Sequence, residues 1–298
     1  MNQILIALIA LANLIVAVTK ALASGVRLNE VLDTQPSLTD EGSSVQTENK
    51  KAPRVAFENV SFTYAGSKEP ALSHISFTAE PGETIGIIGG TGCGKSTLVN
   101  LIPRFYDASA GTVKVDGNIV RNYPFSQLRK KIGVVPQQAV LFKGTICENM
   151  KWGKEDATEE EIQQALTIAQ ASDFVNSKPE GLDTMVSQGG SNLSGGQRQR
   201  LTIARALVGS PEILIMDDSA SALDFATDAA LRHAIHQTKG MTVFIVSQRA
   251  TSIKQADKIL VLDDGQLVGT GTHKELMESC EVYREICLSQ LSEQEVNR

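Results

Sequence analysis

A glycine-rich run in the first third of the chain has the residue types and spacing that bind a phosphate chain. Gly89-Gly-Thr-Gly-Cys-Gly-Lys-Ser96 follows the pattern G-x-x-x-x-G-K-[ST], directly after an apolar run at Glu83–Ile88. Glycines let backbone N–H groups converge on a phosphate, while Lys95 can reach its outer oxygens and the Ser96 hydroxyl can bind Mg²⁺. We therefore predict a site for ATP and Mg²⁺. Its expected nucleotide-binding residues are Gly89, Gly90, Thr91, Gly92, Cys93, Gly94, Lys95, Ser96 and Thr97.

A second apolar run, Ile213-Leu-Ile-Met216, ends in the carboxylates of Asp217 and Asp218. A buried strand delivers the side chain after its last apolar residue to the sheet edge where a phosphate loop also lies. Asp217 is therefore expected to bind Mg²⁺ together with Ser96. An apolar run followed by Asp is a weak signal alone, and the phosphate loop makes it strong.

Leu193-Ser-Gly-Gly-Gln197 is a third candidate for phosphate binding. Ser194 and Gln197 have the spacing of a capping box, in which each side chain binds the backbone N–H of the other residue. The helix that they open presents the N–H groups of its first turn, where Gly195 and Gly196 lie, to an anion. Two phosphate-binding helix starts are one more than a single nucleotide needs.

The runs that must position these groups predict an α/β fold. Val55–Tyr64 and Leu72–Ala79 are rich in Phe, Val, Ile and Thr, which indicates two strands. Further strand runs alternate with helical stretches, a pattern typical of a mostly parallel sheet with helices on both faces. Strand signals disappear between about 138 and 210, where Thr158 and Glu161 form a capping box, so we expect a helical insertion there. The expected buried strands are Glu83–Ile88, Ile132–Val135, Ile213–Met216, Val243–Val246 and Ile259–Leu262.

Composition excludes several classes of protein. Of the 298 residues, 42% are hydrophobic and 21% are charged, which excludes a disordered chain and a polytopic membrane protein. The net charge of −6 argues against nucleic acid as a partner, because that binding needs a basic face. The 4 cysteines have no CxxC pair and no metal-ligand spacing with the 4 histidines, which indicates a reduced compartment and no zinc site.

The first apolar segment, Ile4–Val18, has three interpretations. A signal peptide would explain Ala-Leu-Ala at 21–23, but no Lys or Arg precedes the segment. A buried core helix is the second interpretation. The third is the end of a transmembrane helix that leaves the membrane at Lys20 and Arg27, as the preference for positive charge on the cytosolic side predicts. Extended to Ala23, such a helix just reaches the length of a bilayer core, roughly 30 Å.

Several motifs together resemble the nucleotide-binding domain of ATP-binding cassette (ABC) proteins. They are the phosphate loop, Gln137 after Pro136, Leu193–Gln197, Asp217 and Ser221-Ala-Leu-Asp224, in this order. The resemblance covers about Val55 to Leu291. It implies a P-loop NTPase fold of ABC type, with an antiparallel β subdomain and a helical subdomain, and ATP hydrolysis coupled to transport. It also implies a head-to-tail dimer, in which the signature Leu193–Gln197 closes the ATP held by the opposite phosphate loop.

The family pattern assigns further roles to single positions. Tyr64 matches the aromatic residue that stacks on adenine, although an ordinary strand aromatic is the alternative. Gln137 matches the glutamine that contacts Mg²⁺ and the attacking water and that senses the transmembrane partner. Asp224 matches the carboxylate that communicates across the dimer. Asn100–Asp107 and Ala21–Pro36 resemble exporters whose last transmembrane helix runs into the cassette, which favours the membrane interpretation.

Three positions depart from the family pattern. Asp218 stands where the family has a glutamate that polarises the attacking water, and Gln248 stands where it has a histidine. The shorter Asp withdraws its carboxylate by more than about 1 Å, and a glutamine cannot relay a proton. Gln188 replaces a glutamate that exporters usually carry. These changes resemble the ATPase-impaired half of heterodimeric ABC exporters, with Asp218, Gln248 and Gln137 as the residues of a weakened catalytic site.

The leading interpretation is a cassette that binds ATP, hydrolyses it slowly, and completes with its signature the site of a different partner cassette with intact Glu and His. The alternative is a self-sufficient homodimeric exporter ATPase that uses Asp218 as its base. A soluble ABC ATPase that acts on DNA or ribosomes is a third interpretation. The acidic charge and the apolar first segment argue against it.

The motifs and the composition predict an organisation along the chain. Residues 1–32 are the end of the last transmembrane helix and its cytosolic extension, 33–53 a linker, 54–292 the cassette and 293–298 a tail. The cassette is expected at the cytoplasmic face of the cell membrane, in contact with transmembrane helices. A cassette behind one apolar segment indicates a fragment or a split gene product.

Overall fold

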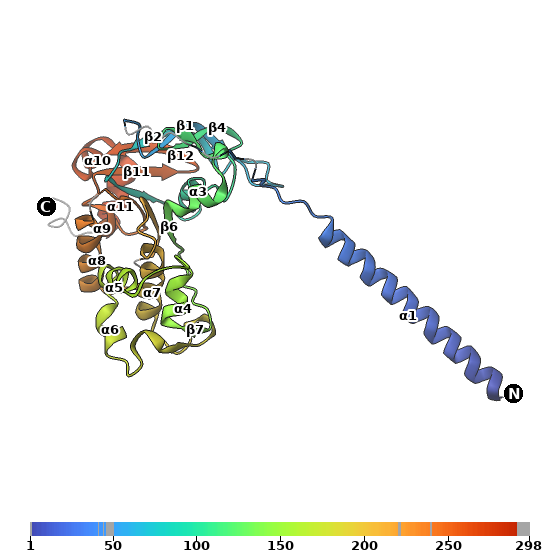
Figure 1. Ribbon diagram of the computed structural model, residues 1–298. Coiled ribbons are helices and arrows are strands. Elements are labelled where there is room, and N and C mark those ends of the chain that lie inside the picture. Colours follow the sequence, from blue (N-terminus) through green and yellow to red (C-terminus); the bar gives the residue numbers. More distant parts are fainter. Residues whose placement is uncertain are drawn as a thin grey trace. The chain divides into compact units, whose positions relative to one another are not determined.

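The computed structural model describes residues 2–40, 42–43, 45, 51–219, 222–238 and 240–290. Two compact units make up the chain, Met1–Thr39 and Asp40–Arg298 (Figure 1). The first unit contains one helix, and the second contains the motifs of the cassette. Ser221, residues 46–50 of the expected linker and the expected tail at 293–298 lie outside the described residues.

The first unit is built around α1 (Asn2–Leu32), a helix of 31 residues. The expected continuation of the apolar segment as a helix to Leu32 is confirmed. At about 1.5 Å per residue α1 is about 46 Å long, which exceeds the bilayer core. Its mean hydropathy reaches 2.4 over 18 residues, and all its side chains are exposed. By length and composition α1 can cross a membrane, and a signal sequence near an N-terminus shares these properties.

A six-stranded sheet forms the centre of the second unit. Its strands, in spatial order, are β12 (Gln266–Gly271), β11 (Lys258–Asp263), β3 (Thr84–Gly89), β10 (Thr242–Val246), β9 (Ile213–Asp217) and β6 (Ile132–Val135). Neighbouring strands are parallel except for β11 and β12. Every residue of β10 is buried, because this apolar run is covered on both faces. The predicted α/β fold with a mostly parallel sheet is confirmed.

A second, antiparallel sheet has the order β2 (Leu72–Ala79), β1 (Val55–Phe62), β4 (Ala110–Val115) and β5 (Asn118–Ile119). Phe57 and Phe77 stack across β1 and β2, with ring centroids 4.7 Å apart. The prediction for Leu72–Ala79 is confirmed. The predicted strand at Val55–Tyr64 is too long, because the carbonyl of Tyr64 already accepts the N–H of Ser67 in a turn.

The sequence patterns do not indicate β4 and β12. Two residues of β4 are buried and none of β12, so both lack the apolar run that marks the other strands. β12 also contains Gly269 and Gly271, and glycine weakens a strand signal. Half-exposed strands of this kind depend on their neighbours more than on their own residues.

Helices cover the central sheet and fill the segment at 138–210 (Figure 1). The capping box of Thr158 and Glu161 is confirmed at the start of α5. One short ladder, β7 (Gly144–Thr145) with β8 (Met185–Val186), corrects the expectation that this segment has no strands, because two-residue strands leave no periodic pattern. The helices are α2 (Lys95–Asn100), α3 (Phe125–Lys130), α4 (Ile146–Lys151), α5 (Glu159–Ile168), α6 (Ser172–Asn176), α7 (Gly195–Leu207), α8 (Phe225–Gln237), α9 (Ala250–Ile253), α10 (His273–Ser279) and α11 (Glu281–Gln290), with 3-10 turns η1 (Val120–Asn122), η2 (Gly181–Asp183) and η3 (Gln188–Gly190).

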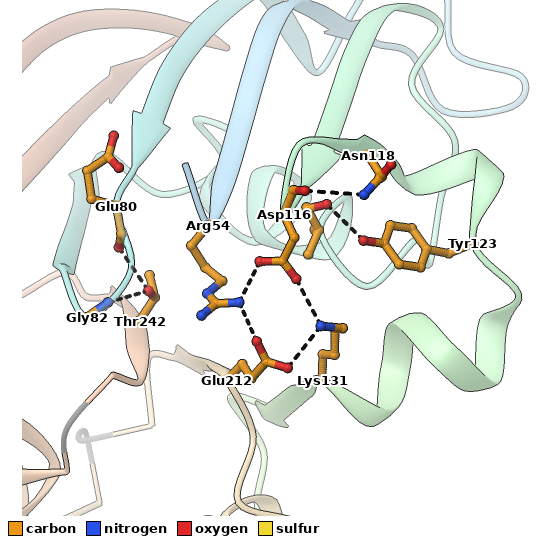
Figure 2. A network of polar contacts seen from close by, with 10 residues as sticks. Arg54, Glu80, Gly82, Asp116, Asn118, Tyr123, Lys131, Glu212 and Thr242 are labelled. Atoms are coloured by element: carbon orange, nitrogen blue, oxygen red, sulfur yellow. Dashed lines mark hydrogen bonds and ion pairs between the residues drawn. The ribbon is translucent and has the colours of Figure 1, made fainter. Parts of the chain in front are cut away.

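Four charged side chains join the two sheets in a closed ring (Figure 2). Arg54, just before β1, pairs with Asp116 and with Glu212. Lys131 pairs with the same two carboxylates, at 3.0 Å from Asp116 and 2.9 Å from Glu212. The Asp116 side chain is only 8% exposed, so the two cations compensate the cost of burying its charge. Since Lys131 precedes β6 and Glu212 precedes β9, the ring anchors the antiparallel sheet to one edge of the central sheet.

Candidate nucleotide site

A cleft of about 200 Å³ lies at the carboxyl ends of β3, β9 and β10. This is the edge of a parallel sheet where ligands commonly bind. Of the residues that line it, all except Val246 are expected site residues, so the structure brings motifs from distant parts of the chain together. The lining residues are Thr91, Gly92, Gly94, Lys95, Ser96, Thr97, Gln137, Asp217, Asp218, Val246 and Gln248.

Lys95 begins α2, and its ammonium lies inside the phosphate loop. Its Nζ donates to the carbonyls of Gly89 at 2.9 Å and of Gly90 at 2.6 Å, and lies 3.6 Å from Cys93 Sγ. The residue is only 8% exposed, so these carbonyls stabilise a nearly buried charge. Phosphate oxygens can replace the carbonyls as acceptors, with shorter and stronger charge-assisted bonds.

Gly94, immediately before α2, is a position that only glycine fits. Its φ is +99°, and a Cβ there would lie 2.7 Å from the carbonyl oxygen of Ala71. The close approach and the left-handed backbone both depend on the missing side chain. Any other residue would displace the loop that faces the cleft.

Asp217 ends β9 beside Ser96, in the position expected for a magnesium ligand. Burial raises the pKa of its carboxyl above the usual range, and the charge of Asp218 acts in the same direction. A hydrogen bond from Ser96 and the charge of Lys95 oppose this shift. A hydroxyl next to a carboxylate offers the oxygen ligands that Mg²⁺ prefers, with phosphate oxygens and waters for the remaining positions.

No group of three or more His, Cys, Asp and Glu side chains suited to a metal ion occurs in the described part of the chain. Ser96 and Asp217 offer two oxygen ligands, a number that fits a cation bound mainly through its nucleotide, as Mg²⁺ commonly is. The Gln137 amide oxygen, also in the cleft, is the third expected ligand. Magnesium would neutralise phosphate charge here and orient the terminal phosphate.

Asp218 follows in a left-handed backbone conformation, with φ +45°. Its N–H donates to the carbonyl of Val246 at 2.9 Å, which joins the ends of β9 and β10. Its carboxylate accepts a long hydrogen bond, 3.5 Å, from Gln137 Nε2. Aspartate and asparagine are the non-glycine residues that tolerate this conformation best. An aspartate therefore suits the backbone at this point.

The three expected catalytic residues, Asp218, Gln248 and Gln137, share the cleft. Two of them carry amides, which donate and accept hydrogen bonds but do not titrate near neutral pH. Among the described residues that line the cleft, Asp217 and Asp218 are the two carboxylates. Either of them can accept a proton from a water molecule bound between them and a phosphate.

Tyr64 lies outside the cleft lining but contacts its edge. Its Oη is 2.9 Å from Thr97 Oγ1, and its ring packs edge-on against Phe62 and Tyr106, with centroids 4.7 and 5.3 Å away. With 38% of the residue exposed, the ring can still receive a base. Tyr106 is a supporting residue that sequence reasoning did not single out. Its only signal was its place in the exporter-like run Asn100–Asp107.

The signature residues do not reach this cleft. Ser194 caps α7 and accepts the Gln197 N–H at 3.2 Å, while Gln197 Oε1 accepts the Ser194 N–H at 3.1 Å, so the predicted capping box is confirmed. Gly195 and Gly196 form the first turn. These four residues are all described, and none of them lines the cleft. The start of α7 therefore lies outside this chain's own cleft.

Asp224 is also absent from the cleft lining. It caps α8, where its two carboxylate oxygens accept the Thr227 N–H and hydroxyl, each at 2.9 Å. These hydrogen bonds lower the pKa of its carboxyl. Gln188, the third departure, begins η3 and does not line the cleft either.

A larger cavity, of about 570 Å³, lies between α8, α9 and β10. Its lining includes Arg232, His233 and His236 but no phosphate-loop residue and no carboxylate. Volume alone therefore does not mark the reactive site. The smaller cleft is the one with the chemistry for a nucleotide.

Comparisons with known proteins agree with this geometry. Residues 72–221 match the family model described as ABC transporter. The chain is 46% identical over 277 residues to an uncharacterized ABC transporter ATP-binding protein of Bacillus subtilis. This match covers 93% of this chain and 48% of that protein. It is 42% identical over 269 residues to a β-(1→2)glucan export ATP-binding/permease protein of Rhodopseudomonas palustris. This match covers 90% of this chain and 44% of that protein.

The solved structure of a bacterial Atm1-family ABC exporter with ATP bound is similar to the structure of this chain. The TM-score is 0.84 at 34% identity, and the match covers 92% of this chain and 48% of that one. The chain thus spans about half the length of the relatives that it matches. The matched family region extends from β2 past β9 and includes the phosphate loop, the signature and Asp217. The chain therefore belongs to the ABC transporter family, and its second unit is an ATP-binding cassette of that family.

Proposed function

We propose that this chain is the ATP-binding cassette of an ABC exporter, together with the end of its membrane domain, and that it closes head-to-tail against a second cassette. The observation that carries the proposal is the position of Ser194–Gln197 outside the chain's own cleft. ATP in the cleft contacts the phosphate loop on one side, and the start of α7 from another cassette supplies the opposite wall. Closure around ATP and opening after its hydrolysis to ADP and phosphate would power transport.

The cleft of this chain is the weaker of the two composite sites in the proposed dimer. Asp218 and Gln248 both line it, so the two departures meet at one place. The Asp218 side chain is one CH₂ shorter than a glutamate, so its carboxylate lies further from the attacking water. Gln248 can bind a γ-phosphate but cannot become cationic. A different partner subunit, with Glu and His at these positions, would then contain the fast site, which this chain's signature completes.

An exposed apolar patch that begins three residues after Gln137 in the sequence supports a membrane-domain partner. Val140, Phe142 and Trp152 are 48, 44 and 69% exposed, and the rings of Phe142 and Trp152 lie 4.6 Å apart. Contiguous exposed aromatic groups mark interaction surfaces. Since Gln137 is three residues before Val140, a helix seated on the patch could sense the cleft. Together with α1, this patch supports a location of the cassette at the cytoplasmic face of the cell membrane, and the net charge of −6 supports the absence of a nucleic-acid partner.

The proposed function is tested with the full purified chain in detergent. We expect ATP binding that depends on Mg²⁺ and Lys95, with slow hydrolysis that Asp218→Ala slows further. A hydrolysis rate unchanged by Asp218→Ala would show that the impaired-site proposal is wrong. Vigorous turnover by this chain alone, abolished by Asp218→Asn, would instead establish a self-sufficient homodimer.

A further inference from the structure

The last residue of α11 contacts the main chain on both sides of Arg249. Gln290 Nε2 donates to the carbonyl of Gln248 at 2.8 Å, and Gln290 Oε1 accepts the N–H of Ala250 at 2.9 Å. One side-chain amide therefore holds the backbone of the residue whose side chain faces the cleft. Gln290 itself does not line the cleft.

The packing of α11 determines where this amide lies. Tyr283, Cys287 and Gln290 are spaced i, i+4 and i+7, so they share one face of the helix. Tyr283 and Cys287 are fully buried, and the Tyr283 hydroxyl is 2.8 Å from His273 Nδ1 of α10. Tyr283 and Cys287 thus fix the helix to the core. The third residue on the same face is Gln290, whose side-chain amide contacts the carbonyl of Gln248.

The segment after β10 depends on contacts of this kind. Arg249 precedes α9 and provides no side-chain cap, so the amide of Ala250, the first residue of that helix, needs an acceptor from elsewhere. Gln290 supplies it. Further back, Ser247 is tied to the sheet through its N–H to the Ile87 carbonyl at 3.1 Å, and its hydroxyl accepts the Arg249 N–H at 2.9 Å. Gln248 is therefore held by β3 on one side and by α11 on the other.

We propose that Gln290 is a positioning residue for the cleft, which acts through Gln248 and makes α11 part of the γ-phosphate response. The inference rests on the proposed function, because it needs Gln248 to contact the terminal phosphate. Without the Gln290 amide, the carbonyl of Gln248 and the first turn of α9 lose their fixed position. The Gln248 side chain is then no longer held in its orientation toward the cleft. Nucleotide is then released faster, although no group that touches it has changed.

The test uses the full chain and measures the release rate of a fluorescent ATP analogue (mant-ATP) with Mg²⁺. Gln290→Met keeps the length and helix propensity of the side chain but removes both hydrogen bonds. At about 1 kcal/mol for each of the two bonds, release should accelerate by up to about 30-fold. The matched control is Ser289→Ala on the same turn, where the hydroxyl donates to Ile286 within α11, and its release rate should equal that of the unchanged chain.

A second background separates positioning from a general loss of stability. In Gln248→Ala, which has no side-chain amide to aim, Gln290→Met should change release by less than about twofold, because the two substitutions act on one contact. Effects that multiply instead would overturn the proposal, and so would a Gln290→Met release rate equal to that of Ser289→Ala. Lys95→Ala keeps the two proposals distinct: if it leaves binding unchanged the proposed function fails, whereas normal Lys95 dependence with a silent Gln290→Met refutes only the role of Gln290.

Discussion

Replacing Asp218 by glutamate should raise the rate of ATP hydrolysis at the cleft. The added CH₂ advances the carboxylate by more than about 1 Å toward the water that attacks the γ-phosphate, and a misplacement of about 1 Å can cost on the order of 100-fold in rate. We therefore expect an increase of about tenfold to 100-fold for Asp218→Glu. Adding Gln248→His should raise the rate again, because a histidine can become cationic and bind the transferred phosphate more strongly.

The same substitution should cost stability, for a reason visible in the backbone. Asp218 has φ +45°, a conformation that a longer side chain without local hydrogen bonding tolerates less well, at a cost of roughly 1 kcal/mol. For a unit of this size that cost corresponds to a decrease in Tm of about 2–4 °C. A faster but less stable variant is thus the expected signature, and a general improvement of the fold would change Tm in the opposite direction.

Steady-state phosphate release by the full chain, at saturating Mg-ATP and high protein concentration, measures the effect. A second copy of this chain offers an intact Ser194–Gln197, so the assay needs no other protein. Asp264→Glu is a matched control, because Asp264 is exposed, has φ +42° and does not line the cleft. It should lower Tm by a similar amount and leave the rate unchanged. No gain from Asp218→Glu or from the double variant, with normal ATP binding, would refute the reasoning that carboxylate reach limits this site.

Three further outcomes are expected. Asp217→Asn should raise the Tm of the ligand-free chain at pH 7 and abolish the stabilisation by Mg-ATP. Burial raises the pKa of the Asp217 carboxyl in the folded state, so its charged form destabilises the fold above that pKa. This cost disappears below the pKa of the unfolded chain, so the gain in Tm should vanish in acid. Lys95→Ala should weaken ATP binding itself, measured by calorimetry, because the loop then has no cation for the phosphate oxygens; unchanged affinity would contradict this. Gly94→Ala should destabilise the cassette by about 2 kcal/mol or more in urea unfolding, from a left-handed backbone and a contact with the Ala71 carbonyl; a loss below about 0.5 kcal/mol would show that the loop relaxes freely.

The strands that the sequence predicts well are those whose burial is continuous. β6 begins and ends where its apolar run does, β9 and β10 differ from their predicted ranges by one residue at one end, and β3 differs by one residue at each end. β4 and β12 escape prediction because their stability comes from the neighbours with which they pair. The ion ring escapes too, since Arg54 and Glu212 are far apart in sequence and their pairing follows from the sheet topology alone.

The cleft could be predicted in large part because its chemistry is local to short motifs. A phosphate loop after one buried strand and an Asp after another meet as soon as the strands are parallel neighbours in one sheet. Gln290 has no such motif. An amide at the end of a C-terminal helix becomes significant only when the face shared by Tyr283 and Cys287 is buried and directs it to Gln248. The left-handed backbone at Asp218, likewise, is a property of the turn and not of the residue pair.

The cleft also lies where the two packing clusters of the cassette meet. Along β9, Ile215 packs into the cluster that contains Leu98 of α2, whereas Met216 packs into the cluster that contains Leu201 of α7 and Tyr283 of α11. The phosphate loop therefore belongs to one cluster, and the signature helix, α9 and α11 belong to the other. In the proposed dimer each ATP would touch the first cluster of one chain and the second cluster of its partner. Release of the γ-phosphate would then remove a contact from both kinds of cluster at once. In each chain, Gln290 connects the cluster that contains α7 and α11 to the cleft of that chain.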